Sequence, residues 1–427
     1  MDDEHSLQIF RETLKLPGTA ADELETSGMD ATLSQASDVL MAKTEPPDLA
    51  SPSVEIIMKN LLARLEEERL GAGKPLAHLW YYPSRHRFAV LLSHDVDEIR
   101  WSWRRKLLMG ALHPSTLSTR GQAYWNFEKI MALEESQGVR ATFFVVPAGT
   151  HPKDPPYSLA DLVATIRGLA SEGWEVGVHG SFESFDRLDM LASQKRALED
   201  SLGRSVAGVR QHFINFKSPV TWRLQQEAGF IYDTTVASRE KAGFRTGFCH
   251  PYRPQGLRLI EIPLTVMDGQ LFWYERLDED RAYERTMALV RSAAEHKGVA
   301  CLNWHQHTMD EYSFPGWWAV FRRVLKDLVP MNPWFATGEE IAVWWNRRSG
   351  IRFEEDRVMK GSAAWKITDP VGGPATLRIV LPSDETLKIQ VVGPAGAYEA
   401  LEEKGQVWLS FKDLPAAETV EVSVRRS

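Results

Sequence analysis

The stretch Phe88-Ala-Val-Leu-Leu-Ser-His-Asp-Val-Asp97 carries the strongest indication of the fold. Its first half is short, apolar and flanked by polar residues, which is typical of a strand buried on both faces of a parallel sheet. Its second half brings Asp95 and Asp97 to the end of that strand. In parallel α/β sheets and barrels, reactive groups gather at the carboxyl ends of strands, because the loops there converge on one mouth. Asp95 and Asp97 are therefore the first candidates for chemistry.

Outward from this strand, helical and strand patterns alternate along the chain. A helical pattern before Gly138 is followed by the apolar run 141–146, and a helix opening at Ser158 is followed by the strand 174–178. Such alternation predicts a parallel α/β sheet, closed or nearly closed. We expect further strands at 206–209, 230–232, 257–262 and 299–304, and helices at 189–203, 217–228, 281–296 and 316–328.

The two ends of the chain have a different pattern. After Trp345, apolar residues alternate with period two between Gly and Pro turns, which predicts a small antiparallel β module at 361–427. Residues 1–52 are rich in Asp, Glu, Ser, Thr and Ala and end in a proline-containing stretch, so we expect a flexible N-terminal extension. The predicted barrel domain then covers 53–350.

Composition narrows the class of protein. The chain has 427 residues, of which 43% are hydrophobic, and its net charge is −8 without a long Lys/Arg block, so nucleic acid is an unfavoured partner. Two cysteines, Cys249 and Cys301, exclude a disulfide framework and a four-cysteine zinc site. The acidic start is unlike a signal peptide, and no apolar run reaches the ~18 residues of a membrane span, so we expect a cytoplasmic protein.

Three more polar groups follow predicted strands. His179 follows the run 175–178, Arg210 ends the next strand, and His305-Gln-His307 follows the run 300–304. Taken singly, such residues have simpler explanations. A lone Asp-x-Asp is more often a helix cap, and a lone histidine is more often structural. Their joint occurrence at matching places predicts a metal site, because one carboxylate could hold a cation while the other acts as a base.

These motifs together resemble the polysaccharide deacetylase family, also called the NodB homology domain or carbohydrate esterase family 4. The resemblance rests on 93–97, on 138–145 with its Ala-Thr-Phe-Phe, on 173–181 and on the strand that ends at His305, and it covers roughly 88–345 in the right order. It implies a distorted (β/α)7 barrel that removes acetyl groups from N-acetylated sugars with a bound divalent metal, commonly zinc.

By position, the resemblance makes Asp95 the general base, Asp97 a metal ligand and His179 the second ligand. Such a base takes a proton from water that a metal has made more acidic.

The remaining catalytic positions come from later strands. Arg210 lies where the family's arginine holds the catalytic aspartate, and Asp233 matches the acid that orients the catalytic histidine. His305 matches that histidine, the general acid, which protonates the departing amine. We favour His305 over His307 because His305 directly follows the strand.

The chain departs from the family pattern at two motifs. The second motif usually has a histidine four residues after the first, and here that position is Glu183, a candidate third ligand that could equally face solvent. The third motif, usually Arg-x-Pro-Tyr, has His212 in place of its proline, so His212 is a candidate ligand or substrate contact. His250, before a proline, is a further candidate, although a role in a turn is the simpler reading.

Aromatic residues near the later strand ends suggest a carbohydrate substrate, because sugars stack their C–H faces on such rings. Trp304 is a candidate of this kind, although core packing would also explain it. The leading hypothesis is a metal-dependent deacetylase of an N-acetylated sugar or glycan in polysaccharide metabolism. The alternatives are a catalytically silent glycan-binding protein on the same barrel and a hydrolase of a non-sugar C–N amide bond.

Overall fold

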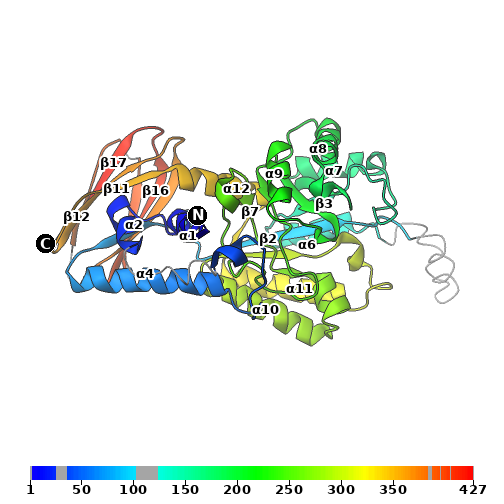
Figure 1. Ribbon diagram of the computed structural model, residues 1–427, viewed down its shortest axis with the longest axis horizontal. Helices are drawn as coiled ribbons and strands as arrows, with labels where there is room; N and C mark the ends of the chain where they lie inside the picture. Colours follow the sequence, from blue (N-terminus) through cyan, green and yellow to red (C-terminus); the bar gives the residue numbers. More distant parts are fainter. Residues whose placement is uncertain are drawn as a thin grey trace. The chain divides into compact units, whose positions relative to one another are not determined.

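The computed structural model describes residues 2–25, 36–101, 124–382, 387–394, 396–403 and 405–426. The chain folds into two compact units (Figure 1). The barrel unit contains residues 41–52 and 89–342, and the sandwich unit contains residues 1–40, 53–88 and 343–427.

The barrel unit is built on one curled parallel sheet. Its strands run in the order β7-β6-β5-β4-β3-β2-β9-β8, and β10 pairs with β2 beside this path. Every residue of β2 is buried, as expected for a strand that is covered on both faces. The strands are β2 (Ala89–Val96), β3 (Thr142–Val145), β4 (Glu175–Gly180), β5 (Gly208–Gln211), β6 (Tyr232–Asp233), β7 (Ile260–Glu261), β8 (Val266–Met267), β9 (Val299–Asn303) and β10 (Trp334–Phe335).

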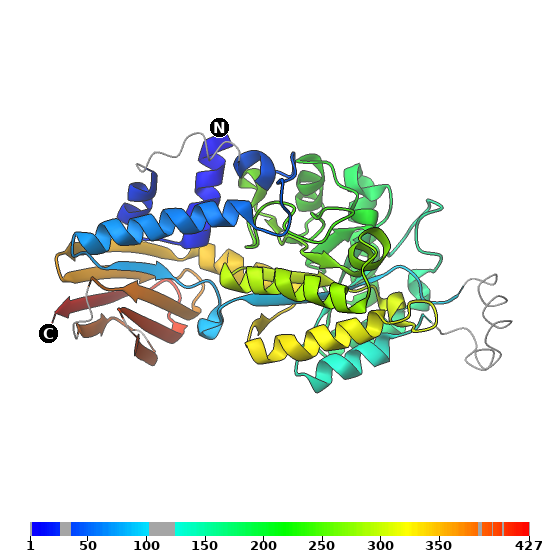
Figure 2. The same cartoon turned by 90° about the horizontal axis from the view of Figure 1, so that it is seen from below.

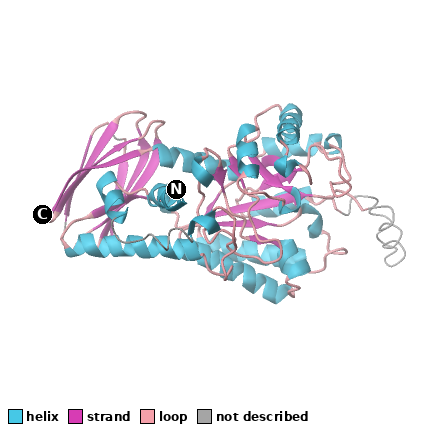
Figure 3. Cartoon of the chain, in the orientation of Figure 1, coloured by secondary structure: helices cyan, strands magenta, loops and turns pink. Residues whose placement is uncertain are grey.

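Helices flank this sheet (Figure 3). Helix α11 shows why they pack: Val320, Phe321 and Val324 are buried, whereas Arg322 and Arg323 are exposed. Helices α10 and α11 lie side by side (Figure 2), joined by the Tyr283 hydroxyl, which donates to Asp327. The helices are α6 (Phe127–Ser136), α7 (Val163–Ser171), α8 (Leu188–Leu202), α9 (Val220–Glu227), α10 (Glu279–Glu295) and α11 (Trp317–Leu328). Helix α12 (Gly338–Gly350) begins in the barrel unit, and its residues from 343 onward belong to the sandwich unit.

The predicted fold class, an α/β barrel of parallel strands with a C-terminal all-β module, is confirmed. The four helices expected between 189 and 328 all form, with ends displaced by a few residues. Among the described residues, no helix is both long enough and apolar enough to cross a membrane.

The sandwich unit contains two four-stranded sheets, ordered β1-β13-β16-β15 and β11-β12-β17-β14. Alternate residues of β12 and β16 are buried in a shared apolar core around Trp365, Leu377 and Leu409, which explains the period-two pattern. Its strands are β1 (Leu76–Leu79), β11 (Arg352–Met359), β12 (Ser362–Thr368), β13 (Gly373–Val380), β14 (Leu387–Val392), β15 (Tyr398–Glu403), β16 (Gln406–Leu414) and β17 (Thr419–Arg426).

The boundaries of the units differ from the predicted domains. Residues 53–88, expected in the barrel, belong to the sandwich unit, because β1 pairs antiparallel with β13. Helix α4 (Ser53–Gly71) is tied to the same unit by Arg69, whose buried guanidinium binds Glu355 of β11. The module also begins earlier than residue 361, since β11 starts at Arg352. Pairing between strands far apart in sequence leaves no local signal, which explains the difference.

The N-terminal region also differs from the expected flexible extension. It contains α1 (Asp2–Leu14) and α2 (Gly18–Glu25), and α1 buries Phe10 and Leu14. Residues 41–52 belong to the barrel unit, where the Phe244 N–H donates to the Leu49 carbonyl over 2.8 Å. The polar average composition of 1–52 conceals the few apolar residues that these segments bury.

Candidate functional site

The candidate site lies in a pocket of about 440 Å³ at the carboxyl ends of the barrel strands. Asp95 and Asp97 come from the end of β2, His179 from the end of β4, His212 from the turn after β5 and His305 from the loop after β9. All five line the pocket. The parallel sheet brings them together because its strands all end at one edge.

Asp95 is held by charge and hydrogen bonds on both oxygens. The buried Arg210 donates from Nη1 to Asp95 Oδ1 over 2.9 Å, and Asn303 Nδ2 donates to Oδ2 over 2.9 Å. Burial raises the pKa of Asp95, but the Arg210 guanidinium and the nearby imidazoles lower the pKa further, so the net shift is downward. Asp95 is therefore a fixed, ionised carboxylate, and Arg210 holds it as expected.

Three ligand-type atoms converge next to Asp95. The Nε2 atom of His179 and the Nδ1 atom of His212 lie 3.4 Å and 3.3 Å from Asp97 Oδ1, and 3.1 Å from each other. Both histidines are buried, and the carboxylate of Asp97 is 20% exposed. Burial raises the pKa of Asp97, but the His212 and His179 rings outweigh it and hold that pKa well below its usual range.

The hydrogen bonds behind the two histidines determine what these atoms can do. His179 Nδ1 lies 2.9 Å from the Arg210 carbonyl, and His212 Nε2 lies 2.9 Å from the Lys153 carbonyl. A carbonyl only accepts, so each of these nitrogens carries a proton, and His179 Nε2 and His212 Nδ1 are the ring atoms directed at Asp97. These two nitrogens and an Asp97 oxygen lie at contact distance from one another, an arrangement suited to a shared cation. Asp97, His179 and His212 could therefore hold a metal ion.

His305 faces the same centre from the loop after β9. Its Nε2 lies 3.5 Å from Asp97 Oδ2, and its Nδ1 donates to Asp268 Oδ1 over 2.6 Å. Asp268 also accepts from the His305 backbone N–H and from the Thr308 hydroxyl. Burial lowers the pKa of His305, but the Asp268 and Asp97 charges outweigh it and raise the pKa to about 10.

Asp268 occupies the place that the sequence assigns to Asp233. Asp233 is buried on β6, where it accepts from Gln225 and Thr235, and its register partner on β7 is Glu261. Its carboxylate is thus engaged away from His305, which is a correction of the predicted pairing. Asp268 directly follows β8, a strand of two residues, too short for a recognisable period. The sequence pattern around Asp268 therefore gives no signal that singles it out.

Glu183, the expected third ligand, is exposed and immediately precedes the short 3-10 turn Ser184–Asp186. The candidate cluster contains His212 in its place. The expected spacing fails because the chain after His179 turns away: the Phe182 N–H donates to Asp154 over 2.7 Å. Of the two roles considered for His212, that of a substitute ligand thus matches the geometry.

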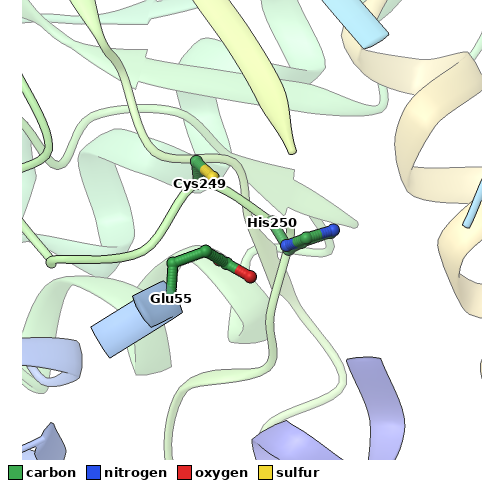
Figure 4. Close-up of side chains that lie close together, drawn as sticks. All are labelled: Glu55, Cys249 and His250. Carbon is green, nitrogen blue, oxygen red and sulfur yellow. The ribbon is translucent and has the colours of Figure 1, made fainter. Parts of the chain in front are cut away.

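Two expected substrate contacts lie elsewhere. Trp304 is fully buried and packs against Phe272 and Phe321, outside the residues that line the pocket. His250 is also fully buried and lies beside Cys249 on one loop of the barrel unit, again outside the lining (Figure 4). Glu55, drawn with them, belongs to the sandwich unit, and we assign no site to these residues.

His307 lines the pocket together with His305. The two rings lie 5.5 Å apart, and His307 packs against Phe314 and Tyr124. The His305 ring contacts both Asp97 and Asp268, which agrees with the preference for His305.

The pocket has an aromatic rim, and two of its members, Trp273 and Tyr274, are among the aromatic residues near the later strand ends that suggested a carbohydrate substrate. Phe213, Trp273 and Tyr274 are 46%, 50% and 47% exposed, and all three line the pocket. Trp273 and Tyr274 belong to a single π-helical turn, Gln270–Tyr274, that follows β8. Phe213 has a φ of +58°, uncommon outside glycine, in the turn after β5. Exposed rings at a pocket mouth are suited to stacking on a ligand.

Comparisons with known proteins place the fold among solved structures. No protein-family model matches the chain, and no curated protein matches it. The chain is similar to a protein of Mycobacterium smegmatis assigned to the polysaccharide deacetylases, with 21% identity, a TM-score of 0.46 and coverage of 62% of this chain and 92% of that one. It is also similar to the PuuE allantoinase, with 18% identity, a TM-score of 0.44 and coverage of 62% and 92%. A third similar structure is a CE4 family pseudoenzyme of Bacillus anthracis, with 14% identity, a TM-score of 0.35 and coverage of 61% and 66%.

Proposed function

We propose that this chain is a metal-dependent hydrolase of the polysaccharide deacetylase type, which removes the acetyl group from an N-acetylated sugar or glycan. One observation carries the proposal. Asp95, His305 and the three possible metal ligands, Asp97, His179 and His212, line a single pocket. A fixed carboxylate, a cation site and an imidazole backed by a carboxylate are the groups that amide hydrolysis requires.

The donor set fits zinc. Ligand atoms at about 2.0–2.1 Å from a tetrahedral zinc ion lie roughly 3.3 Å from one another. The separations among Asp97 Oδ1, His179 Nε2 and His212 Nδ1 are 3.1–3.4 Å. The carbonyls behind both histidines fix the rings, as hydrogen-bond acceptors behind metal-binding histidines do in zinc sites. A bound divalent metal would make its water more acidic and polarise the amide carbonyl.

Asp95 is the proposed general base. Its Oδ2 atom lies 3.8 Å from His179 Nε2, which places the carboxylate beside the three donors without joining them. Arg210 and Asn303 hold both oxygens in place, so the carboxylate is oriented before substrate arrives. It would take the proton of the water that attacks the acetyl carbonyl.

His305 is the proposed general acid. Asp268 accepts from Nδ1, so the second ring nitrogen, Nε2, faces the pocket on the side of Asp97. From there it can donate a proton to the amine as the C–N bond breaks, which yields acetate and a free amino sugar. Asp268 acts through His305 and is therefore a positioning residue.

The pocket supports a sugar substrate. Its volume of about 440 Å³ accommodates a group of monosaccharide size, and its exposed rings are placed to stack on neighbouring sugars. The alternative of a silent binding protein rests on a lost third ligand, and His212 supplies a third donor.

Elemental analysis of protein purified without a histidine tag tests the centre. We expect near-stoichiometric divalent metal in the wild type, and its loss from Asp97→Ala, His179→Ala and His212→Ala. Glu183→Ala, in the neighbouring turn, is the matched control and should retain the metal. Acetate release from N-acetylglucosamine oligosaccharides then tests the reaction. A wild type that stays metal-free after reconstitution would contradict the proposal.

A further inference from the structure

Two cations lie beside the candidate centre on the same side of the pocket. Lys153 and Arg239 both line it, and both are exposed. Lys153 comes from the loop after β3 and Arg239 from the segment after β6, but both reach the turn that follows β5. Neither side chain takes part in the metal cluster or in the acid–base machinery, so the proposed reaction leaves the two charges without a role.

The Lys153 and Arg239 side chains both contact Phe213. The Nζ atom of Lys153 lies 4.6 Å from the centre of the Phe182 ring and 5.6 Å from that of Phe213. Arg239 Nη2 donates to the Phe213 carbonyl over 3.3 Å and to Asn215 Oδ1 over 3.1 Å. These contacts orient the two positive groups beside an exposed ring, and they leave donors on both groups for a ligand.

The main chain ties these cations to the centre. The Lys153 carbonyl accepts from His212 Nε2 over 2.9 Å, and His212 directly precedes Phe213. The His212 and Phe213 rings lie 4.5 Å apart, so a ligand stacked on Phe213 would lie next to one residue of the candidate metal cluster and beside both positive groups.

Carboxylates near the pocket do not neutralise them. Within the described ranges, no carboxylate lies within 4.0 Å of Lys153 Nζ or of the Arg239 guanidinium. The carboxylate of Asp154, next to Lys153, instead accepts the backbone N–H groups of His151 and Phe182. Glu98, the other acidic lining residue outside the centre, follows Asp97 on the β2 side. The Phe213 side of the pocket is thus positively charged.

We propose that Lys153 and Arg239 bind an anionic group, a carboxylate or a phosphate, carried by the substrate next to its N-acetylated sugar. This inference rests on the proposed function, whose substrate class it narrows from N-acetylated glycans in general to acidic ones. Arg guanidinium and Lys ammonium groups are the usual partners of carboxylates and phosphates, and cations at a pocket mouth also attract such substrates from solution.

Matched substrates test the effect of the substrate's negative charge. The first is a tetrasaccharide that alternates N-acetylglucosamine with glucuronic acid, the second is its methyl ester, and the third is UDP-N-acetylglucosamine. With the full chain, we expect kcat/KM for the acid to exceed that for the ester about tenfold, mainly through KM, and to fall as salt is added. A phosphate specificity would instead give the tightest binding to the nucleotide sugar.

Variants assign the effect to the two side chains. Arg239→Gln and Lys153→Gln should each reduce the ratio of kcat/KM for the acid to that for the methyl ester about threefold. The double variant should abolish this preference for the acid, while it hydrolyses the ester at an unchanged rate. Arg323→Gln and Lys326→Gln, exposed cations on α11 outside the pocket, are the matched controls. If the pocket variants slow the acid and the ester equally, the two residues only support the loop, and the inference is wrong.

The outcomes also separate this inference from the proposed function. Hydrolysis of acid and ester at equal rates, with the nucleotide sugar no better, would overturn the anion site and leave the deacetylase proposal intact. Calorimetry with the same probes measures binding in the case where no probe is hydrolysed. If no probe is hydrolysed but the anionic ones bind tighter in a manner that needs Lys153 and Arg239, the anion site stands and the deacetylase proposal fails.

Discussion

The two ends of strand β4 carry buried ionisable groups with opposite surroundings. Glu175, its first residue, accepts the Tyr232 and Thr142 hydroxyls and the Glu339 N–H over 2.8–2.9 Å. His179, near the other end, has one nitrogen on a carbonyl and the other directed at acceptors of Asp97 and His212. The Glu175 carboxylate is hydrogen-bonded within the protein, whereas His179 faces Asp97 and His212, with which it could hold a metal ion.

This difference separates stability from function along one strand. At the amino end of a parallel barrel strand, a buried polar group serves the packing of the sheet, so its hydrogen bonds are complete. At the carboxyl end, the loops form a pocket. A polar side chain that faces this pocket is placed to bind a metal ion or a substrate. The predictions below test whether changes at the two ends affect different properties.

The largest effect is expected from Asp95→Asn. This change removes the proposed base at the carboxyl end but keeps its shape, so kcat should fall by about 10³-fold or more. Metal content and the melting temperature should stay close to those of the wild type, as elemental analysis and calorimetry would check. Activity above a tenth of wild type would exclude Asp95 as the base.

His212→Ala should come next. Losing one of three donors should strip the metal and lower activity by at least about 10²-fold, measured as metal per chain and as acetate release. Glu183→Ala is the control, and its metal content and its rate of acetate release should both stay within about twofold of wild type. If Glu183→Ala loses the metal and His212→Ala keeps it, the family-like spacing is right and the assigned donor set is wrong.

At the amino end, Glu175→Gln should alter the pH dependence of stability. Burial raises the pKa of Glu175 from its ordinary value of 4.5 to about 7. Between these values the folded state holds a proton that the unfolded state releases, so the free energy of unfolding falls as pH rises through that window. The loss should be at most about 3 kcal/mol.

Glu175→Gln should flatten this decline, as urea titrations between about pH 4.5 and 7 would measure. The slope against pH is the readout, because the amide alters the local hydrogen bonds by a constant amount. Glu172→Gln, an exposed residue three positions earlier, is the control and should keep the wild-type slope. A variant that declines as steeply as the wild type would place the titrating group elsewhere.

The smallest effect is expected from Asp268→Asn, because it changes the partner of a catalytic group and spares the group itself. Loss of the charge behind His305 should lower kcat by about 10–100-fold with KM nearly unchanged. Asp233→Asn is the matched comparison and should leave kcat of the folded enzyme within about threefold. The reverse result would restore the family-like pairing of Asp233 with His305.

Local patterns in the sequence predicted much of the barrel and part of the site. The apolar runs at 89–96, 175–180 and 299–303 form strands, and polar residues directly after or at the end of such runs line the pocket. Asp95, Asp97, His179, Arg210 and His305 therefore lie together as expected. The reason is general, since parallel strands of one sheet deliver their carboxyl ends to one edge.

The sequence by itself determined that Asp95, Asp97, His179 and His305 reach the pocket and which segments alternate between strand and helix. Only the tertiary structure decided the third donor, the partner of His305 and the unit to which residues 53–88 belong. Each of these depends on how loops turn after a strand, or on which distant strands pair. The turn that directs Glu183 to solvent and the short β8 that presents Asp268 show this, because atoms a few ångströms apart in space leave no periodic trace in the chain.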